Sequence, residues 1–86
     1  MTKIWADRAW EDYLYWQEQD KKTLKRVNAL LKDIERNGHQ GIGHSEPLKH
    51  EQQDFWSRRI DGTHRLIYRI VDDRLEIVQC RAHYDD

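Results

Sequence analysis

The chain has 86 residues, which is the size of one small domain and leaves no room for a second. Its formal net charge is −1, from 15 Lys and Arg against 16 Asp and Glu, so it lacks the strongly basic composition of a generic nucleic-acid-binding domain. Leu, Ile, Val and Phe account for 18 of the residues, and four Trp and four Tyr add apolar area, so we expect a folded domain with a thin core.

The cellular compartment can be inferred from one residue and from two absences. Cys80 is the single cysteine, so no disulfide can form within the chain and a reducing compartment is expected. The N-terminal residues alternate charged and aromatic types, unlike a secretory signal. No apolar run is long enough to span a bilayer. We therefore expect a cytoplasmic protein without membrane contacts.

One short strand and two helices are predicted in the first half of the chain. Residues 3–6 have strand character, and Asp7 can serve as the N-cap of a helix. A second helix is predicted after Asp20 and ends at Asn37-Gly38, because glycine commonly terminates helices. The apolar stripes that predict the two helices are Trp10, Tyr13, Leu14 and Gln17 in the first, and Leu24, Val27, Leu31 and Ile34 in the second.

The second half predicts a loop followed by three strands. Residues 39–54 contain three histidines, two glycines and the only proline, and we expect them to form a loop. Strands are predicted at 55–60, 64–71 and 74–84, and the Asp-Gly and Asp-Asp pairs between them are typical of hairpin turns. The order is β-α-α-β-β-β. This indicates an α+β fold, a single domain over residues 1–86 with two helices on one face of a mainly antiparallel sheet.

The register of the last hairpin decides which side chains share a face. A two-residue turn at Asp72-Asp73 would put Arg65 and His83 on opposite faces. A three-residue turn at 72–74 would flip the last strand, so that apolar and polar side chains separate, apart from Leu75 and Ile77. We favour the three-residue turn. The polar face would then collect Arg65, Arg69, Gln79, Arg81 and His83, and Cys80 would face the core.

Three of these residues could handle a phosphate on the face that the helices leave open. Arg65 and Arg81 can stabilise negative charge on a phosphoryl oxygen, and His83 can give or take a proton near pH 7. The missing role is that of a carboxylate base, for which Glu46 in the loop is the candidate. Each residue has an ordinary alternative, because loop glutamates and strand arginines are commonly solvated surface groups.

Five blocks of sequence, taken together, resemble one known family. They are WEDYLYWQ at 10–17, EPLKH at 46–50, FWSRRI at 55–60, HRLIY at 64–68 and CRAHY at 80–84. In this order they are similar to the YoeB/Txe toxins, which belong to the RelE-like superfamily of type II toxin–antitoxin toxins. The resemblance covers residues 3–84, and it implies the same β-α-α-β-β-β fold.

The resemblance also implies a function. It implies a ribosome-dependent endoribonuclease (mRNA interferase) that cuts mRNA in the decoding site and is silenced by a YefM-type antitoxin. By position, Glu46 is then the general base for the ribose 2′-OH, Arg65 stabilises the transition state, His83 is the general acid and Tyr84 orients the RNA. The expected products carry a 2′,3′-cyclic phosphate and a 5′-OH, with no metal or other cofactor.

Further residues are secondary candidates. Lys49, Arg59 and Arg81 could contact the RNA backbone, and the alternative is that they are solvated cations. The histidines show no metal-ligand spacing such as HxxxH, so we expect no metal site.

Two further expectations concern partners. Leu75 and Ile77 on the polar face, the several tryptophans and the family tendency favour a homodimer. The alternative to an enzyme is a non-catalytic module that binds the ribosome or an antitoxin and blocks translation by occupancy.

Overall fold

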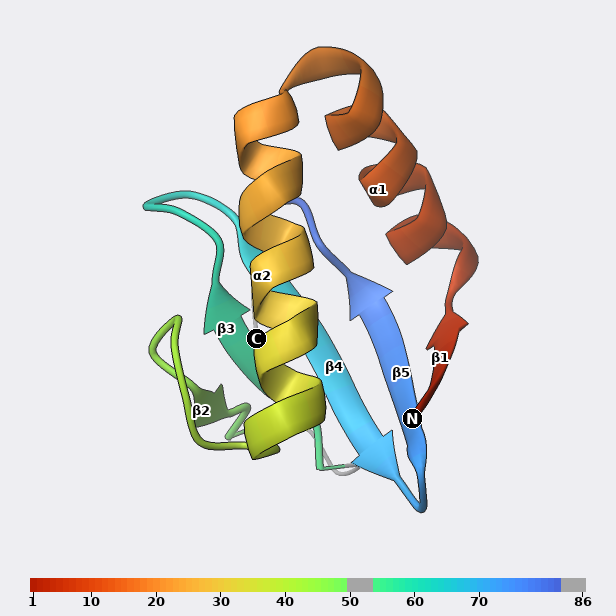
Figure 1. Ribbon diagram of the computed structural model, residues 1–86, viewed down its shortest axis with the longest axis vertical. Coiled ribbons are helices and arrows are strands. Elements are labelled where there is room, and N and C mark those ends of the chain that lie inside the picture. The colour runs from red at the N-terminus through yellow and green to blue at the C-terminus, as the bar shows by residue number, and fades with distance from the viewer. Residues whose placement is uncertain (50–53, 83–86) are drawn as a thin grey trace.

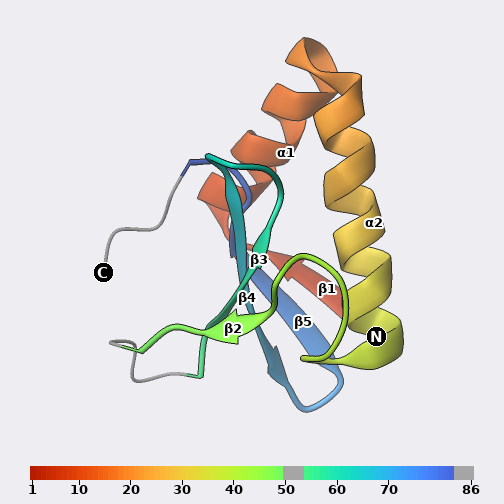
Figure 2. The ribbon, with the colours of Figure 1, turned by 90° about the vertical axis from the view of Figure 1, so that its left-hand side faces the viewer.

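The chain forms a five-stranded sheet with two helices on one of its faces (Figures 1 and 2). The computed structural model describes residues 1–49 and 54–82. The elements are β1 (Thr2–Trp5), α1 (Asp7–Gln19), α2 (Lys21–Asn37), β2 (Glu46–Pro47), β3 (Trp56–Arg59), β4 (Arg65–Val71) and β5 (Arg74–Gln79). The sheet order is β1-β5-β4-β3-β2, and only the β1–β5 pair is parallel among these described strands. The predicted α+β class is confirmed, and the predicted order β-α-α-β-β-β is found with one additional short strand, β2, before the last three strands.

The two helices begin and end where local chemistry favours it, with one difference from the prediction. The Asp20 carboxylate accepts hydrogen bonds from the Thr23 backbone N–H (3.1 Å) and hydroxyl (2.7 Å), which caps α2. Gly38 then ends α2 with a φ of 64°. Asp7, expected to be the N-cap of α1, is instead its first helical residue, and the cap position is Ala6 without a side-chain bond. An acid in the first turn still suits the helix dipole.

The core lies between the helices and the near face of the sheet. The apolar stripe of α2 is buried against residues of β4 and β5, and Trp16 and Ala9 contribute from α1. Cys80 is fully buried in this core, as predicted. The buried members are Ala9, Trp16, Val27, Leu30, Leu31, Ile34, Ile60, Leu66, Tyr68, Leu75, Ile77 and Cys80.

The turn between β4 and β5 corrects the predicted register. Val71 pairs with Arg74, so the turn has two residues, Asp72 and Asp73, and the three-residue turn is wrong. Leu75 and Ile77 consequently face the helices and are 0% and 1% exposed. They do not form the apolar spot on the polar face that was one reason to expect a dimer.

A β-bulge then changes the alignment within the same strand pair. Tyr68 pairs with Ile77, but the preceding Ile67 pairs with Gln79, so Val78 is an extra residue in β5. The bulge moves Gln79 to the face opposite the helices. Gln79 therefore shares a face with Arg65, as predicted, although by a different route.

Two predicted boundaries also change. Glu46 and Pro47, expected within a loop, form the short edge strand β2 against β3. The last strand, expected to reach residue 84, ends at Gln79, and residues 80–82 turn away from it. In the described part of the chain, no helix has the length and apolar character needed to cross a membrane.

Candidate active site

The face of the sheet away from the helices carries the candidate residues that the structure describes. In one row across the strands, Glu46 pairs with Ser57, Ser57 with Ile67, and Ile67 with Gln79. Cross-strand partners point to the same face, and so do residues two apart in a strand. Arg65 therefore shares this face. Figure 2 shows β2 beside β3 at the edge of the sheet, with both helices on one side of the sheet.

Arg65 begins β4, directly after the turn that joins β3 to β4. Its half-buried guanidinium donates from Nη1 to the backbone oxygens of Asp61 (3.0 Å) and His64 (3.1 Å). The Asp61 carboxylate in turn accepts the backbone N–H groups of Thr63 (2.8 Å) and His64 (2.7 Å). Partial burial opposes ionisation of Asp61, but these two N–H groups and the nearby cations outweigh it and lower its pKa. The turn thus holds the Arg65 side chain in place.

Glu46 lies on the exposed edge strand β2, and the segment before it is attached to the rest of the fold through Arg58. Arg58 is 0% exposed and points to the helix side of β3. Its guanidinium donates to the backbone oxygens of Gly38 (2.7 Å) and Ile42 (2.6 Å) and forms an ion pair with Asp33 (2.6 Å). The segment leading to Glu46 is therefore tied to α2.

The Asp33 carboxylate in this network accepts hydrogen bonds from several groups. Asp33 also accepts from the Ile42 backbone N–H (3.1 Å) and the Asn37 side chain (2.8 Å). The Arg58 guanidinium, with smaller help from Asn37 and Ile42, lowers the pKa of Asp33 although partial burial opposes this. A buried arginine with a paired carboxylate is costly to disrupt, because removal of one charge leaves the other buried alone.

The described chain ends next to Arg65. The Arg65 backbone N–H donates to the oxygen of Ala82 (3.1 Å), and the Ala82 N–H donates to Nδ1 of His64 (2.7 Å). Two candidates, His83 and Tyr84, follow Ala82 in the sequence and lie outside the described residues. The structure consequently brings Glu46 and Arg65 to one face and leaves the roles of His83 and Tyr84 as predictions.

The three candidate RNA contacts differ in their surroundings. Arg59 is exposed on β3 and pairs with Arg65 across the strands, so two arginines lie side by side. Lys49 is exposed two residues after β2. Arg81 lies beyond the end of β5, with its guanidinium 3.7 Å from the centre of the Tyr15 ring on α1. Arg81 was expected on the polar face of the last strand, and that placement is wrong because the strand ends earlier.

The spacing between the two sides of the site suits a phosphodiester. Glu46 and Arg65 are two strands and two residues apart, which in a regular sheet separates their Cα atoms by about 12 Å. Both side chains are long enough to approach a group bound between them. A carboxylate on one side and a guanidinium on the other can accept a proton and stabilise an anion, respectively.

Two supporting residues were not singled out by the sequence patterns. Arg58 was read only as part of the FWSRRI block, and His64 only as part of the HRLIY block and as one of several histidines. A signal for Arg58 was available, since it lies two residues from both Trp56 and Ile60 and so shares the apolar, helix-facing side of this segment. Across residues 1–49 and 54–82, no group of three His, Cys, Asp or Glu gathers as metal ligands would.

Known proteins are similar to this chain in sequence. A family model for the YoeB-like toxin of bacterial type II toxin–antitoxin systems matches residues 5–84. Toxin YoeB of Escherichia coli K12 is 52% identical over 84 residues, which is 98% of this chain and 100% of the relative.

Solved structures extend the likeness to the fold. A YoeB/ParE toxin from Agrobacterium tumefaciens is 40% identical with a TM-score of 0.93, and the match covers 98% of this chain and 100% of that one. The Staphylococcus aureus YoeB dimer is 44% identical with a TM-score of 0.92, and a heterotetrameric YoeB–YefM complex from the same organism is 44% identical with a TM-score of 0.90; both matches cover 98% of each chain. The chain belongs to the family of YoeB-like toxins of bacterial type II toxin–antitoxin systems.

Proposed function

We propose that this toxin is an endoribonuclease that cleaves mRNA in the decoding site of the ribosome and thereby stops translation. The observation that carries the proposal is the shared helix-free face of Glu46 and Arg65, with Ala82 hydrogen-bonded to the Arg65 backbone. A base, an anion-stabilising cation and a terminal acid around one face are the groups that RNA cleavage by internal attack requires.

In the proposed reaction, Glu46 takes the proton from a ribose 2′-OH, and the 2′-oxygen attacks the adjacent phosphorus. Arg65 stabilises the extra negative charge that develops on the phosphoryl oxygens. The bond from phosphorus to the 5′-oxygen breaks, and His83 protonates that leaving oxygen, while Tyr84 orients the RNA. The products carry a 2′,3′-cyclic phosphate and a 5′-OH. No metal is needed, because the nucleophile is part of the substrate and its attack is intramolecular.

The ribosome is the proposed partner that presents the substrate. A chain of net charge −1 lacks the excess of positive charge that gives sequence-independent affinity for RNA. Lys49, Arg59 and Arg81 would provide local contacts to the RNA backbone once the mRNA is held in place.

Cleavage of mRNA on programmed ribosomes, followed under single-turnover conditions, tests the proposal. We expect Glu46→Gln and His83→Gln each to slow cleavage by about 10²–10⁴-fold, the usual contribution of a general base or acid. Glu18→Gln on the exposed side of α1 is the matched control and should cleave at the parent rate. Unchanged cleavage by both site variants would contradict the mechanism. Arrest of translation with intact mRNA would support occupancy instead.

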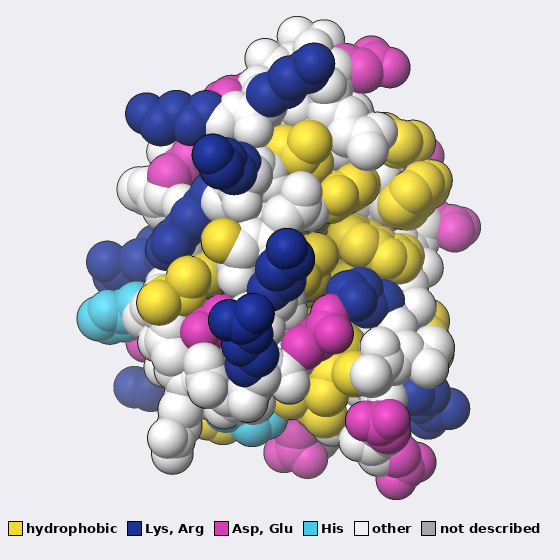
Figure 3. Space-filling view, viewed as in Figure 1, with side chains coloured by type: hydrophobic (Ala, Val, Ile, Leu, Met, Phe, Trp, Pro, Cys, Tyr) yellow, Lys and Arg dark blue, Asp and Glu magenta, His cyan; other side chains and the backbone are white. Residues whose placement is uncertain are grey.

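We also propose a YefM-type antitoxin as the cognate inhibitor and a homodimer as the state of the toxin. The Staphylococcus aureus relatives form a dimer and a YoeB–YefM heterotetramer. On the face shown in Figure 3, hydrophobic side chains gather over the region of α1 and between the helices. The large apolar side chains that are exposed by 39–45% include Trp10, Leu14 and Tyr15 on α1, Ile4 in β1 and Met1 directly before β1.

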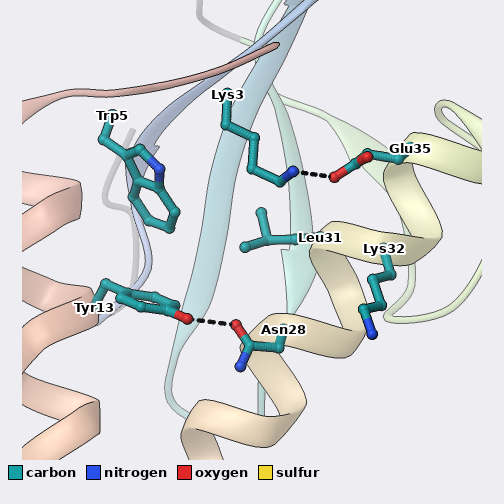
Figure 4. A pocket seen from close by; sticks show the side chains of 7 residues that line it. All are labelled: Lys3, Trp5, Tyr13, Asn28, Leu31, Lys32 and Glu35. Carbon is teal, nitrogen blue, oxygen red and sulfur yellow. Dashed lines mark hydrogen bonds and ion pairs between the residues drawn. The ribbon is translucent and has the colours of Figure 1, made fainter. Parts of the chain in front are cut away.

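An aromatic cluster gives this apolar region its shape. The Tyr13 ring lies 4.9 Å from that of Trp5 and 5.8 Å from that of Trp10, measured between ring centroids. Trp5 and Tyr13 also line a pocket of about 440 Å³ beside α2, shown in Figure 4, where Tyr13 donates to the Asn28 side chain (2.8 Å). Exposed aromatic area of this kind is typical of an interface.

Sedimentation equilibrium tests the dimer. At micromolar concentration we expect the mass of two chains, and Trp10→Ser should shift the equilibrium toward one chain. Glu18→Ser, on an exposed position of the same helix, is the control and should remain dimeric. A parent protein with the mass of a single chain would contradict the homodimer.

A further inference from the structure

His64 holds the end of the described chain through its ring. The Ala82 backbone N–H donates to Nδ1 of His64 at 2.7 Å. A ring nitrogen that accepts a hydrogen bond carries no proton, so the neutral ring is the Nε2–H tautomer. The bond joins residues 18 positions apart, from the residue directly before β4 to the segment after β5.

The ring that accepts this bond is itself held in place. The edge of the Trp16 indole meets it, with ring centroids 4.8 Å apart and planes at 79°. The same indole donates from Nε1 to the backbone oxygen of Cys80 (2.8 Å). On the other side, the Asp61 carboxylate accepts the His64 backbone N–H (2.7 Å). These contacts fix the position of Nδ1, the atom that accepts the hydrogen bond from Ala82.

Ala82 adopts a backbone conformation that needs external support. Its φ is +75°, in the left-handed region that is unfavourable for a residue with a Cβ. Its oxygen accepts from the Arg65 N–H (3.1 Å) while its N–H donates to His64. Arg65 in β4 and His64 directly before it therefore bind the oxygen and the N–H of Ala82, respectively. Strained residues of this kind concentrate at functional sites.

We propose that His64 is a positioning residue for catalysis, because its Nδ1 fixes the backbone of Ala82, the residue that precedes the candidates His83 and Tyr84 in the sequence. The inference rests on the proposed function, because it assumes that His83 and Tyr84 take part in the reaction. In physical terms, the hydrogen bond to Nδ1 fixes the orientation of the backbone at Ala82. Loss of the acceptor frees the Ala82 amide and lowers the fraction of molecules in which Ala82 keeps this conformation, and with it the fraction ready to react.

Two substitutions with the same branched shape distinguish the role of His64 as a hydrogen-bond acceptor from its role in packing. In His64→Asn, Oδ1 is bonded to Cγ as Nδ1 is in histidine, so it can accept from Ala82. In His64→Leu the branch is retained without an acceptor. Ile70→Val, on the helix side of β4, is a control for a small general loss of stability.

The first measurement is independent of activity. In ¹⁵N-labelled toxin we expect a scalar coupling across the hydrogen bond between the Ala82 amide nitrogen and His64 Nδ1. We also expect slow exchange of the Ala82 amide proton in the parent and in His64→Asn, and faster exchange in His64→Leu. No coupling in the parent, or equally slow exchange in His64→Leu, would overturn the inference.

The second measurement is single-turnover cleavage of mRNA on programmed ribosomes. We expect His64→Leu to lower the maximal rate about tenfold, with an unchanged half-saturating concentration, and His64→Asn and Ile70→Val to stay within about twofold of the parent. A tenfold change corresponds to about 1.4 kcal/mol, a size that one hydrogen bond can supply.

The results distinguish this inference from the proposed function. Full activity of His64→Leu while His83→Gln is inactive would overturn the positioning role alone. Equal loss in His64→Leu and His64→Asn would also overturn it, because the acceptor would then be irrelevant. Full activity of His83→Gln would contradict the proposed mechanism, whatever the His64 variants do.

Discussion

Removal of the Asp33 carboxylate is expected to destabilise the fold strongly. In Asp33→Ala the ion pair to Arg58 is lost, together with the bonds from the Ile42 backbone and the Asn37 side chain. The Arg58 side chain is 0% exposed, so its charge would remain buried without an anion. Its two backbone acceptors, the oxygens of Gly38 and Ile42, cannot neutralise it.

The expected cost follows from this burial. Breaking a buried pair by removing one partner typically costs about 3–5 kcal/mol, a large share of the roughly 5–15 kcal/mol that stabilises a small domain. The matched control lies on the same helix. Glu35→Ala removes an ion pair with Lys3 whose side chains are 30% and 37% exposed. Surface pairs of this kind contribute about 0–1 kcal/mol.

Urea unfolding followed by tryptophan fluorescence measures both variants, with extrapolation to zero denaturant. Arg58→Met and the Asp33→Ala/Arg58→Met double variant complete a cycle. We expect the double variant to lose less than the two single losses added together, because no unpaired charge remains in it. A loss below about 1 kcal/mol in Asp33→Ala, or strict additivity in the cycle, would refute the reasoning.

Three further outcomes are expected. Arg58 lowers the pKa of Asp33 below its usual 3.8, so the stabilisation that the Asp33 carboxylate contributes is complete above that pH and is lost as the pH falls through the folded-state pKa. The free energy of unfolding should therefore depend less steeply on acid pH in Asp33→Asn than in the parent. Identical slopes would count against this. Burial, with a smaller contribution from Asp12, raises the pKa of the Cys80 thiol to about 12, so a thiol reagent should react only after unfolding; fast reaction of native protein would show the site to be accessible. Naked RNA at physiological salt should be cut far more slowly than ribosome-bound mRNA, and equal rates would disprove the need for presentation.

The helices and their faces were predictable because the sequence pattern there is long and regular. Leu24, Val27, Leu31 and Ile34 repeat at helical spacing, and all but Leu24 are buried in the structure. The cap at Asp20 and the stop at Gly38 also follow from local chemistry that needs no tertiary contacts.

The register of the last hairpin was not predicted correctly because a bulge is a tertiary feature. Leu75 and Ile77 have odd numbers and Cys80 an even one, yet all three are buried on the same side. A regular strand alternates sides at every residue, so one extra residue is required between them. That mismatch was visible in the sequence, but it was attributed to the length of the turn instead of a bulge at Val78.

The candidate site was predicted in part for a similar reason. The face on which Arg65 lies follows from strand alternation, whereas Glu46 was expected in a loop and its strand β2 was not predicted, although the sequence blocks pointed to both residues. The supporting roles of Arg58 and His64 depend on which backbone groups approach them across the fold, namely Gly38, Ile42 and Ala82. Such contacts between distant segments leave no periodic signal in the sequence.

The most direct test of the central claim is a map of mRNA 5′ ends in cells after brief induction of the toxin. The proposed function predicts new 5′ ends at defined positions within codons of translated messages, present with the parent and absent with Glu46→Gln at equal protein levels. Growth arrest with no new 5′ ends, or the same ends with the variant, would contradict it.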